Sequence, residues 1–174
     1  MATLRKGKCY TKVVRPYTRK SKVKAKNYIK SIPTNKIVRY DIGELTKKFK
    51  YEVNLISKQN IQIRHNAIES ARLVANRRLH TKLGPKNYHF KIMIYPHHIL
   101  RENKMLSGAH ADRLQSGMKH AFGKPVGLAA QVKSGKVVFS TRVDENGLKI
   151  AREAIKTTIP RLPGKFTIEI KKII

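Results

Sequence analysis

Residues 126–143 read VGLAAQVKSGKVVFSTRV, two apolar-rich runs separated by Ser134-Gly135. Glycine tolerates a positive φ, which the tight two-residue turn between antiparallel strands requires. The stretch therefore predicts a β-hairpin with strands over 126–133 and 136–143. This hairpin makes antiparallel pairing the basis of the expected fold.

The sequence on either side of the hairpin adds further strands and helices. Alternating apolar and polar residues predict strands over 37–42, 51–55, 88–95 and 165–171. Helical spacing of apolar residues predicts helices over about 62–80, 110–122 and 148–159, the second of them capped by Gly123 in the left-handed conformation. This mixed order predicts an α+β fold, a two-layer sandwich with helices packed on a largely antiparallel sheet.

The N-terminal segment is strongly basic. Its first forty residues contain thirteen Lys or Arg, and the first acid is Asp41. Such a segment cannot neutralise itself and buries little apolar surface, so we expect residues 1–35 to form an extended basic arm and residues 36–174 a single α+β domain. The arm's tyrosines either stack on unpaired bases or pin the arm to its own domain, and the sequence leaves both interpretations open. These tyrosines are Tyr10, Tyr17 and Tyr28.

The whole chain of 174 residues carries 39 basic and 10 acidic residues, a formal net charge of +29 and a pI near 10.6. A charge of this size favours a polyanionic partner, because each cation that meets a phosphate releases a condensed counterion. We expect cations in the arm, in the helix near 62–80 and at the start of the hairpin to contact RNA. They are Lys8, Arg15, Arg19, Lys20, Lys22, Lys24, Lys26, Arg72, Arg77, Arg78 and Lys124.

The composition disfavours several classes of protein. The single cysteine, Cys9, excludes an intramolecular disulfide and a multi-cysteine zinc site, and it suits a reducing compartment. No apolar run reaches the roughly eighteen residues of a membrane-spanning helix. The basic N-terminus is not followed by the apolar segment of a secretory signal. We therefore expect a soluble intracellular protein with no membrane partner.

A segment of fourteen residues, 96–109, separates the strand that ends at Tyr95 from the helix expected near His110. Connections this long are usually functional or disordered, so we expect a long functional loop at about 96–110. One interpretation makes the loop a finger that enters an RNA cleft, with Arg101 and Lys104 on phosphates. The other folds it onto its own domain. The core residues would then be Ile99, Leu100 and Leu106, and composition leaves both interpretations open.

The histidines near this loop raise the question of catalysis. His97, His98 and His110, with Asp112, are possible metal ligands or acid–base groups, but their spacing matches no known site. The chain has neither a phosphate-cradling G-x-x-x-x-G-K-[ST] motif nor a G-x-S-x-G motif. We expect no enzyme activity, no metal and no cofactor. The alternatives are an RNA-processing enzyme built on the histidines and a nucleic-acid-compacting protein of chromatin type.

Longer motifs resemble those of one protein family. They are Asn103-Lys104-Met105-Leu106-Ser107, Ala111-Asp112-Arg113-Leu114-Gln115, Gly117-Met118, Ala121-Phe122-Gly123-Lys124-Pro125 and Pro163-Gly164-Lys165, together with Lys8-Cys9-Tyr10, Arg15-Pro16-Tyr17-Thr18-Arg19-Lys20, Ile32-Pro33 and Lys36-Ile37 in the arm. Together they are similar to a universal family of large-subunit ribosomal proteins, called L-sixteen in bacteria, in its archaeal and eukaryotic L-ten-e type. Ser107-Gly108 favours an archaeal-like source.

The resemblance implies a non-catalytic structural constituent of the large ribosomal subunit in the cytoplasm. Such a protein binds large-subunit ribosomal RNA near the aminoacyl-tRNA site. Its other implied partners are tRNA, neighbouring ribosomal proteins and subunit assembly factors.

The resemblance also implies that the loop, Arg101 to Asp112 here, points toward the peptidyl-transferase centre and the tRNA in the peptidyl site. The site residues implied there are Arg101, Asn103, Lys104, Met105, Ser107, Gly108, His110, Asp112 and Arg113. One position departs from the family pattern, since His110 stands where glycine is common and adds bulk at the base of the loop.

Overall fold

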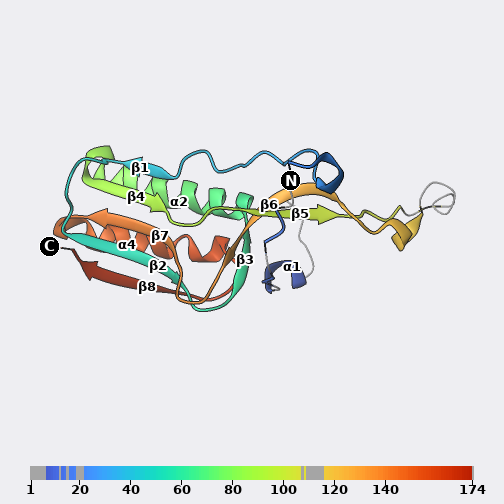
Figure 1. Cartoon of the computed structure of the whole chain (residues 1–174). Helices are drawn as coiled ribbons and strands as arrows, with labels where there is room; N and C mark the ends of the chain where they lie inside the picture. The colour runs from blue at the N-terminus through green and yellow to red at the C-terminus, as the bar shows by residue number, and fades with distance from the viewer. Residues whose placement is uncertain are drawn as a thin grey trace.

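In the computed structural model, which describes residues 7–11, 13–14, 16–18, 22–106, 108 and 116–173, two antiparallel sheets follow one another along an elongated molecule (Figure 1). The larger sheet has the strand order β1-β4-β7-β2-β8 and the smaller sheet the order β3-β6-β5. The larger sheet contains β1 (Asp41–Gly43), β2 (Tyr51–Ser57), β4 (Tyr88–Ile92), β7 (Val137–Val143) and β8 (Phe166–Lys172). The smaller contains β3 (Ile61–Arg64), β5 (His98–Glu102) and β6 (Lys124–Val132).

Two helices, α2 (His65–Leu83) and α4 (Leu148–Lys156), cover one face of the larger sheet. The predicted apolar stripe of α2 is fully buried, in one cluster with Phe90 and Phe139, whose ring centroids lie 5.5 Å apart. The stripe consists of Ile68, Ala71, Ala75 and Leu79. Burial of this stripe removes apolar surface from water, which is the main stabilising term of such a layer. The prediction of an α+β fold with helices on an antiparallel sheet is confirmed.

The remaining helices are short. A single turn, α1 (Lys8–Thr11), lies in the arm, and five 3-10 turns occupy connections among the described residues. The 3-10 turns are η1 (Lys24–Lys26), η2 (Pro85–Asn87), η3 (Gly117–His120), η4 (Glu145–Gly147) and η5 (Ile159–Arg161). Among the described helices, none is both long and apolar enough to cross a membrane.

The predicted hairpin forms its turn but not its pairing. The Lys136 N–H donates to the Lys133 carbonyl at 3.2 Å across Ser134-Gly135, and Gly135 has a φ of 81°. The two strands then separate, because β6 pairs with β3 and β5 whereas β7 pairs with β4 and β2. The end of β2 lies against the turn, where Ser57 accepts from the Gly135 N–H at 2.8 Å and donates to the Lys136 carbonyl at 3.0 Å. The turn therefore joins the two sheets.

The helix predicted over 110–122 is wrong in its described part. Residues 109–115 lie outside the described residues, η3 is the only helical turn in 116–123, and β6 begins at Lys124. Met118 and Phe122, expected on the buried face, are 63% and 49% exposed. The η3 turn lies beyond both sheets and has no core to cover (Figure 1), and Phe122 packs only against side chains at the base of the loop.

Gly123 does not act as a left-handed cap, since it is not among the glycines with positive φ. It is glycine for a different reason. A Cβ on Gly123 would lie 2.6 Å from the backbone carbonyl carbon of Glu102, so the two chains at the base of the loop approach too closely for a side chain.

The loop predicted at about 96–110 is also shorter than expected, since β5 occupies its first half. Ile99 is 3% exposed and pairs in register with Leu128 of β6, as the interpretation of a loop folded on its own domain required. Leu106 is 49% exposed, which agrees instead with a protruding segment. Each interpretation therefore describes one half of the segment, and the protruding part begins after Glu102.

Candidate nucleic-acid interface

The described part of the arm packs against the smaller sheet. Ile29 is 1% exposed and forms a second, small core cluster with Ile99 and Leu128, against which Tyr17 packs. The backbone continues this contact, because the Ile99 N–H donates to the Tyr17 carbonyl at 2.9 Å. The arm is thus held on the domain by apolar burial and by a backbone hydrogen bond, as one of the two interpretations of its tyrosines required.

All three arm tyrosines contact the rest of the chain. The Arg64 guanidinium lies 5.5 Å from the ring centroid of Tyr10, and the ring of Tyr28 lies 5.9 Å from that of Phe122. Together with the packing of Tyr17 this favours the interpretation of the tyrosines as anchors of the arm. Tyr28 remains 50% exposed.

Two histidines accept hydrogen bonds from the arm side of the molecule. His98 Nδ1 accepts from the Tyr17 N–H at 2.8 Å, and His65 Nδ1 accepts from the Lys36 N–H at 3.4 Å. Burial, followed by the charge of Arg101, lowers the pKa of His98. Burial, followed by Lys36 and Arg64, lowers the pKa of His65. Both rings are therefore neutral at ordinary pH, which is the form whose Nδ1 can accept a hydrogen bond.

The histidines expected as a possible catalytic set are not brought together as one. His98 is engaged with the arm, His97 is exposed against the ring of Tyr95 at 4.6 Å, and His110 lies outside the described residues. Within the described ranges no three His, Cys, Asp or Glu side chains are grouped as metal ligands.

Arg101 lies against two aromatic rings at the base of the loop. Its guanidinium carbon is 4.2 Å from the ring centroid of Tyr17 and 4.4 Å from that of Phe122. We call Tyr17, Tyr28, Arg101 and Phe122 the arginine stack. It joins the arm, β5 and the segment through which the chain returns from the loop to β6. Arg101, predicted to contact RNA or tRNA, is exposed and also makes cation–π contacts with Tyr17 of the arm and Phe122 beyond the loop.

The described residues of the protruding loop are mostly exposed. Lys104 is exposed, Met105 is 51% exposed, and Gly108 is exposed with a φ of 142°. Asn103 instead spans the two sides of the loop, because its Nδ2 donates to the Gly117 carbonyl at 3.4 Å. Ser107, His110, Asp112 and Arg113, the other predicted loop residues, lie outside the described residues.

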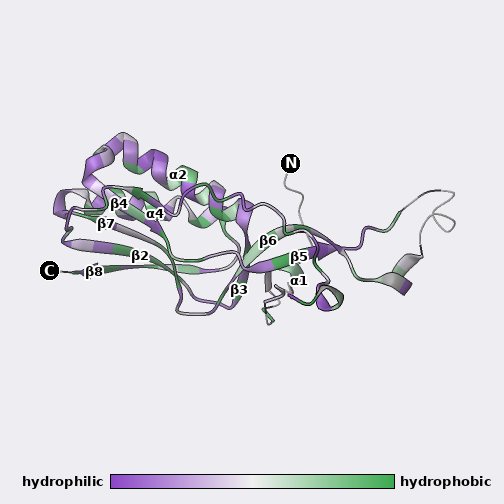
Figure 2. Ribbon diagram, turned by 45° about the horizontal axis from the view of Figure 1, so that its top comes forward, coloured by the Kyte–Doolittle hydropathy of each residue, from purple (hydrophilic) through white to green (hydrophobic). Residues whose placement is uncertain are grey.

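The predicted phosphate contacts are spread over several elements. Lys22 and Lys26 are exposed in the arm, Arg77 and Arg78 are exposed on α2, and Lys124 is exposed at the start of β6. Figure 2 shows hydrophilic residues along the outward side of α2. Arg78 also pairs with Glu153 of α4 at 2.6 Å. Lys8 begins α1 and Lys24 begins η1, whereas Arg15, Arg19 and Lys20 lie outside the described residues.

The prediction that Arg72 contacts phosphate is wrong. Arg72 is 6% exposed, and its guanidinium donates to Glu69 from Nε at 2.8 Å and from Nη2 at 2.5 Å. Glu69 in turn accepts from the Val38 N–H at 3.3 Å. The chain around Val38 therefore covers the side of α2 that helical periodicity alone placed at the surface.

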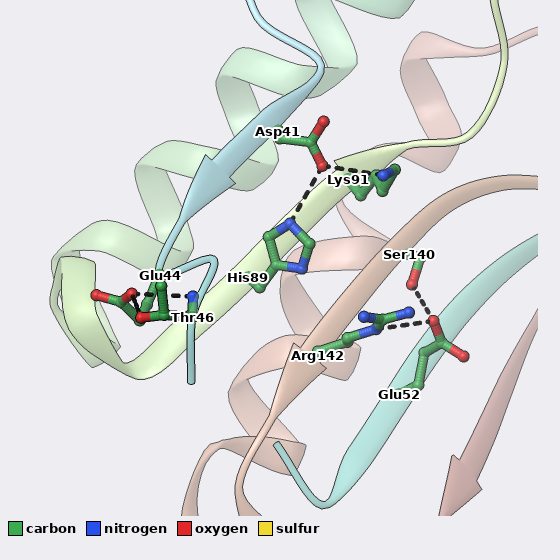
Figure 3. A network of polar contacts seen from close by, with 8 residues as sticks. All are labelled: Asp41, Glu44, Thr46, Glu52, His89, Lys91, Ser140 and Arg142. Carbon is green, nitrogen blue, oxygen red and sulfur yellow. Dashed lines mark hydrogen bonds and ion pairs between the residues drawn. The ribbon is translucent and has the colours of Figure 1, made fainter. Parts of the chain in front are cut away.

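The face of the larger sheet turned away from the helices carries paired charges, which sequence patterns did not single out. We call it the open face (Figure 3). Asp41 lies 3.2 Å from His89 Nε2 and 3.4 Å from Lys91 Nζ. Glu52 accepts from Ser140 Oγ at 2.7 Å and from Arg142 Nε at 3.3 Å.

The pKa of Glu52 reflects the hydrogen bonds that it accepts on this face. Burial alone would raise the pKa of Glu52, but hydrogen bonds led by that from Ser140 outweigh burial and lower it. On β8, Lys171 pairs with Glu169 at 3.4 Å. The charges on this face are thus matched, whereas the arm, the outward side of α2 and the loop carry cations in excess.

The chain is similar to known ribosomal proteins over nearly its whole length. The family model described as "Ribosomal protein L16p/L10e" matches residues 14–169. Proteins named large ribosomal subunit protein uL16 are 44% identical in Staphylothermus marinus, over 98% of this chain and 95% of that protein, and 43% identical in Sulfolobus acidocaldarius, over 98% and 95%. The protein of that name from Methanococcus aeolicus is 44% identical over 97% of this chain and 95% of its own. The chain therefore belongs to the L16p/L10e family, the uL16 proteins, and is a non-enzymatic structural constituent of the large subunit of the cytoplasmic ribosome.

Proposed function

We propose that this chain binds large-subunit ribosomal RNA near the aminoacyl-tRNA site through its arm, the outward side of α2 and the start of β6, with residues 1–35 as the binding arm and 36–174 as a single domain. The observation that carries this proposal is the uneven distribution of charge. The net charge is +29, yet the open face pairs its charges, so the excess lies on the surfaces that contain Lys22, Arg77 and Lys124. Phosphate neutralisation releases counterions and favours these surfaces as the RNA-binding side.

The loop is proposed to reach the peptidyl-transferase centre and tRNA. The arginine stack lies at its base, Lys104 and Met105 are exposed, and the loop as a whole extends beyond both sheets (Figure 1). A finger anchored at its base and exposed at its end suits an element that reaches into a neighbouring cleft. Assembly factors that inspect the subunit are proposed partners of the same end.

The experiment uses particles sedimented after a high-salt wash, from cells that carry either the full chain or a loop-replaced chain. Residues 104–120 are replaced by a short Gly-Ser linker. This closure is feasible because a Cβ on Gly123 would lie 2.8 Å from the Asn103 nitrogen, so the two ends are adjacent.

We expect both chains to remain with the large subunit and only the loop-replaced particles to bind peptidyl-site tRNA weakly. Loss of the full chain from washed particles would contradict RNA binding. Normal tRNA binding and normal subunit maturation with the replaced loop would contradict the role of the loop.

A further inference from the structure

A cavity of about 480 Å³ lies at the N-terminus of α2, between the arm and the smaller sheet. Its walls include Cys9 and Lys36 from the arm side, Arg64 and His65 at the start of α2, and Leu100 and Gly127 from β5 and β6. The volume falls within the roughly 300–1,000 Å³ that is usual for sites of small ligands. Arg101 of the arginine stack also lines the cavity, but the functions proposed above assign no ligand to it.

His65 presents a hydrogen-bond donor to this cavity. The residue is 7% exposed, and its Nδ1 accepts the Lys36 N–H, so the neutral ring carries its proton on Nε2. Among the described residues, none accepts a hydrogen bond from Nε2. A Cβ on Gly127, in the cavity wall, would lie 3.6 Å from this nitrogen. His65 Nε2 is therefore a donor at the cavity wall that no described residue engages and that a ligand in the cavity can reach.

The surroundings of this donor favour an anion. The nineteen-residue helix α2 begins at His65, its N-cap residue Arg64 makes no side-chain capping hydrogen bond, and its first turn has no acid. The positive end of the helix dipole and the charges of Lys36 and Arg64 therefore act on the same space. Glu102 also lines the cavity, so the space next to this carboxylate is less favourable to an anion.

The rest of the wall is partly apolar. Pro33, Leu100 and Leu128 line the cavity beside the charged groups. The cations, the apolar wall and the His65 N–H donor would together suit a ligand that has an anionic end, a flat and partly apolar body and one hydrogen-bond acceptor. A nucleotide has this chemistry, and so does the backbone of an RNA strand at a nucleotide that has left its stack.

We propose that this cavity holds one unstacked nucleotide of an RNA strand, with its phosphate at the N-terminus of α2 near Lys36 and Arg64 and its base accepting from His65 Nε2. This inference rests on the proposed RNA binding and names one site within it. A stacked duplex cannot place a single nucleotide there, so the site selects a bulged or single-stranded position.

The test uses the full chain and four variants. His65→Asn keeps an acceptor near the position of Nδ1 but lacks a donor at the position of Nε2, whereas His65→Gln retains a donor at that reach. Gly127→Ala leaves every charge in place and fills the space in front of Nε2. His80→Ala, on the exposed side of the same helix, is the matched control.

The probes are the four ribonucleoside 5′-monophosphates, a dinucleotide, ATP and inorganic phosphate. They are titrated at elevated salt while the backbone amide resonances of Lys36 and Leu100, cavity residues present in every variant, are followed by NMR. We expect the dinucleotide and at least one monophosphate to shift these resonances saturably. His65→Asn and Gly127→Ala should weaken binding at least tenfold, and His65→Gln and His80→Ala less than threefold.

Unchanged binding by Gly127→Ala would overturn the proposal even if the histidine variants failed to fold. Inorganic phosphate binding as tightly as the monophosphates would overturn it in favour of a simple anion site. Preference for ATP over the dinucleotide would overturn it in favour of a free nucleotide. A full chain that stays on washed ribosomes but binds no probe would remove this site and leave the proposed function standing, whereas loss from the ribosome would remove the function itself.

Discussion

At the scale of single residues, the two neutral histidines predict that the arm loosens in acid. The pKa values of His65 and His98 are lowered in the folded chain, whereas a histidine in the unfolded chain has a pKa of about 6.5. The unfolded chain therefore binds more protons below that pH. The stabilisation from both rings is fully present above about pH 6.5 and is lost as the pH falls through their lowered pKa values.

The measurement for this prediction is the rate of alkylation of Cys9, the single cysteine, as the pH is lowered, with rates corrected for the thiolate fraction. We expect the corrected rate to rise in acid as the arm detaches from His98. His98→Asn, which keeps an acceptor near Nδ1 at every pH, should flatten the rise, and His97→Asn, at an exposed ring, should not. A corrected rate that is independent of pH in the unmodified chain would contradict the prediction.

The buried pair on α2 predicts a contrast in stability. Hydrogen bonds from Arg72 lower the pKa of Glu69, and the side chains of Arg72 and Glu69 are only 8% and 14% exposed. Glu69→Ala leaves the Arg72 charge buried without its partner, so we expect a loss of about 3 kcal/mol in the free energy of unfolding. Glu153→Ala removes the surface partner of Arg78, whose pair is 41% and 45% exposed, and should cost less than about 1 kcal/mol.

Denaturant titration of both variants measures this contrast. Equal losses would mean that Arg72 reaches solvent in the folded protein and is available to RNA after all.

At the scale of elements, the arginine stack predicts that charge alone does not replace Arg101. Its guanidinium lies 4.2 and 4.4 Å from the centroids of two rings, and lysine offers no planar group to lie against them. Arg101→Lys should therefore increase proteolysis of the arm and of the loop base in the free protein. Phe122→Leu should act in the same direction.

Lys104→Arg, at an exposed loop position, is the control that preserves charge while changing its shape. It should leave the proteolysis pattern unchanged. If Arg101→Lys behaves like this control, Arg101 acts as a point charge toward RNA or tRNA, as the sequence suggested, and not as a positioning residue.

At the scale of the whole molecule, sequence patterns predicted local structure well. They predicted less well which segments pair and pack with each other. The apolar stripe ending at Leu79 and the turn at Gly135 follow from spacing and backbone freedom, and both are present. The strands that flank this turn separate because Ser57, far away in the sequence, takes its hydrogen-bonding groups. A local sequence pattern cannot show that a distant strand competes with the hairpin for the same hydrogen bonds.

The site shows the same division. The basic surface was predictable from composition, but the hydrogen bond from Tyr17 to His98 joins residues 81 positions apart. Arg72 was misassigned because helical periodicity cannot show that the chain around Val38 covers it. The contacts of the arm were therefore the least predictable part of the site, since a segment without internal periodicity carries no local signal for the surface on which it packs.

The distribution of charge predicts which lysines control the salt dependence of RNA binding. A cation that contacts a phosphate contributes about one unit to the slope of log affinity against log salt. Lys22 and Lys26 are exposed in the arm, so replacing both with glutamine should reduce the slope by about two units.

Lys91 and Lys171 lie on the open face and already pair with Asp41 and Glu169. The same double replacement at these two positions removes equal formal charge. It should nevertheless leave the slope nearly unchanged, because side chains that contact no phosphate release no counterions on binding. The measurement is the affinity of the full chain for a large-subunit ribosomal RNA fragment over a series of salt concentrations. Equal slopes for the two double variants would mean that net charge alone drives binding and that the arm has no privileged contact with RNA.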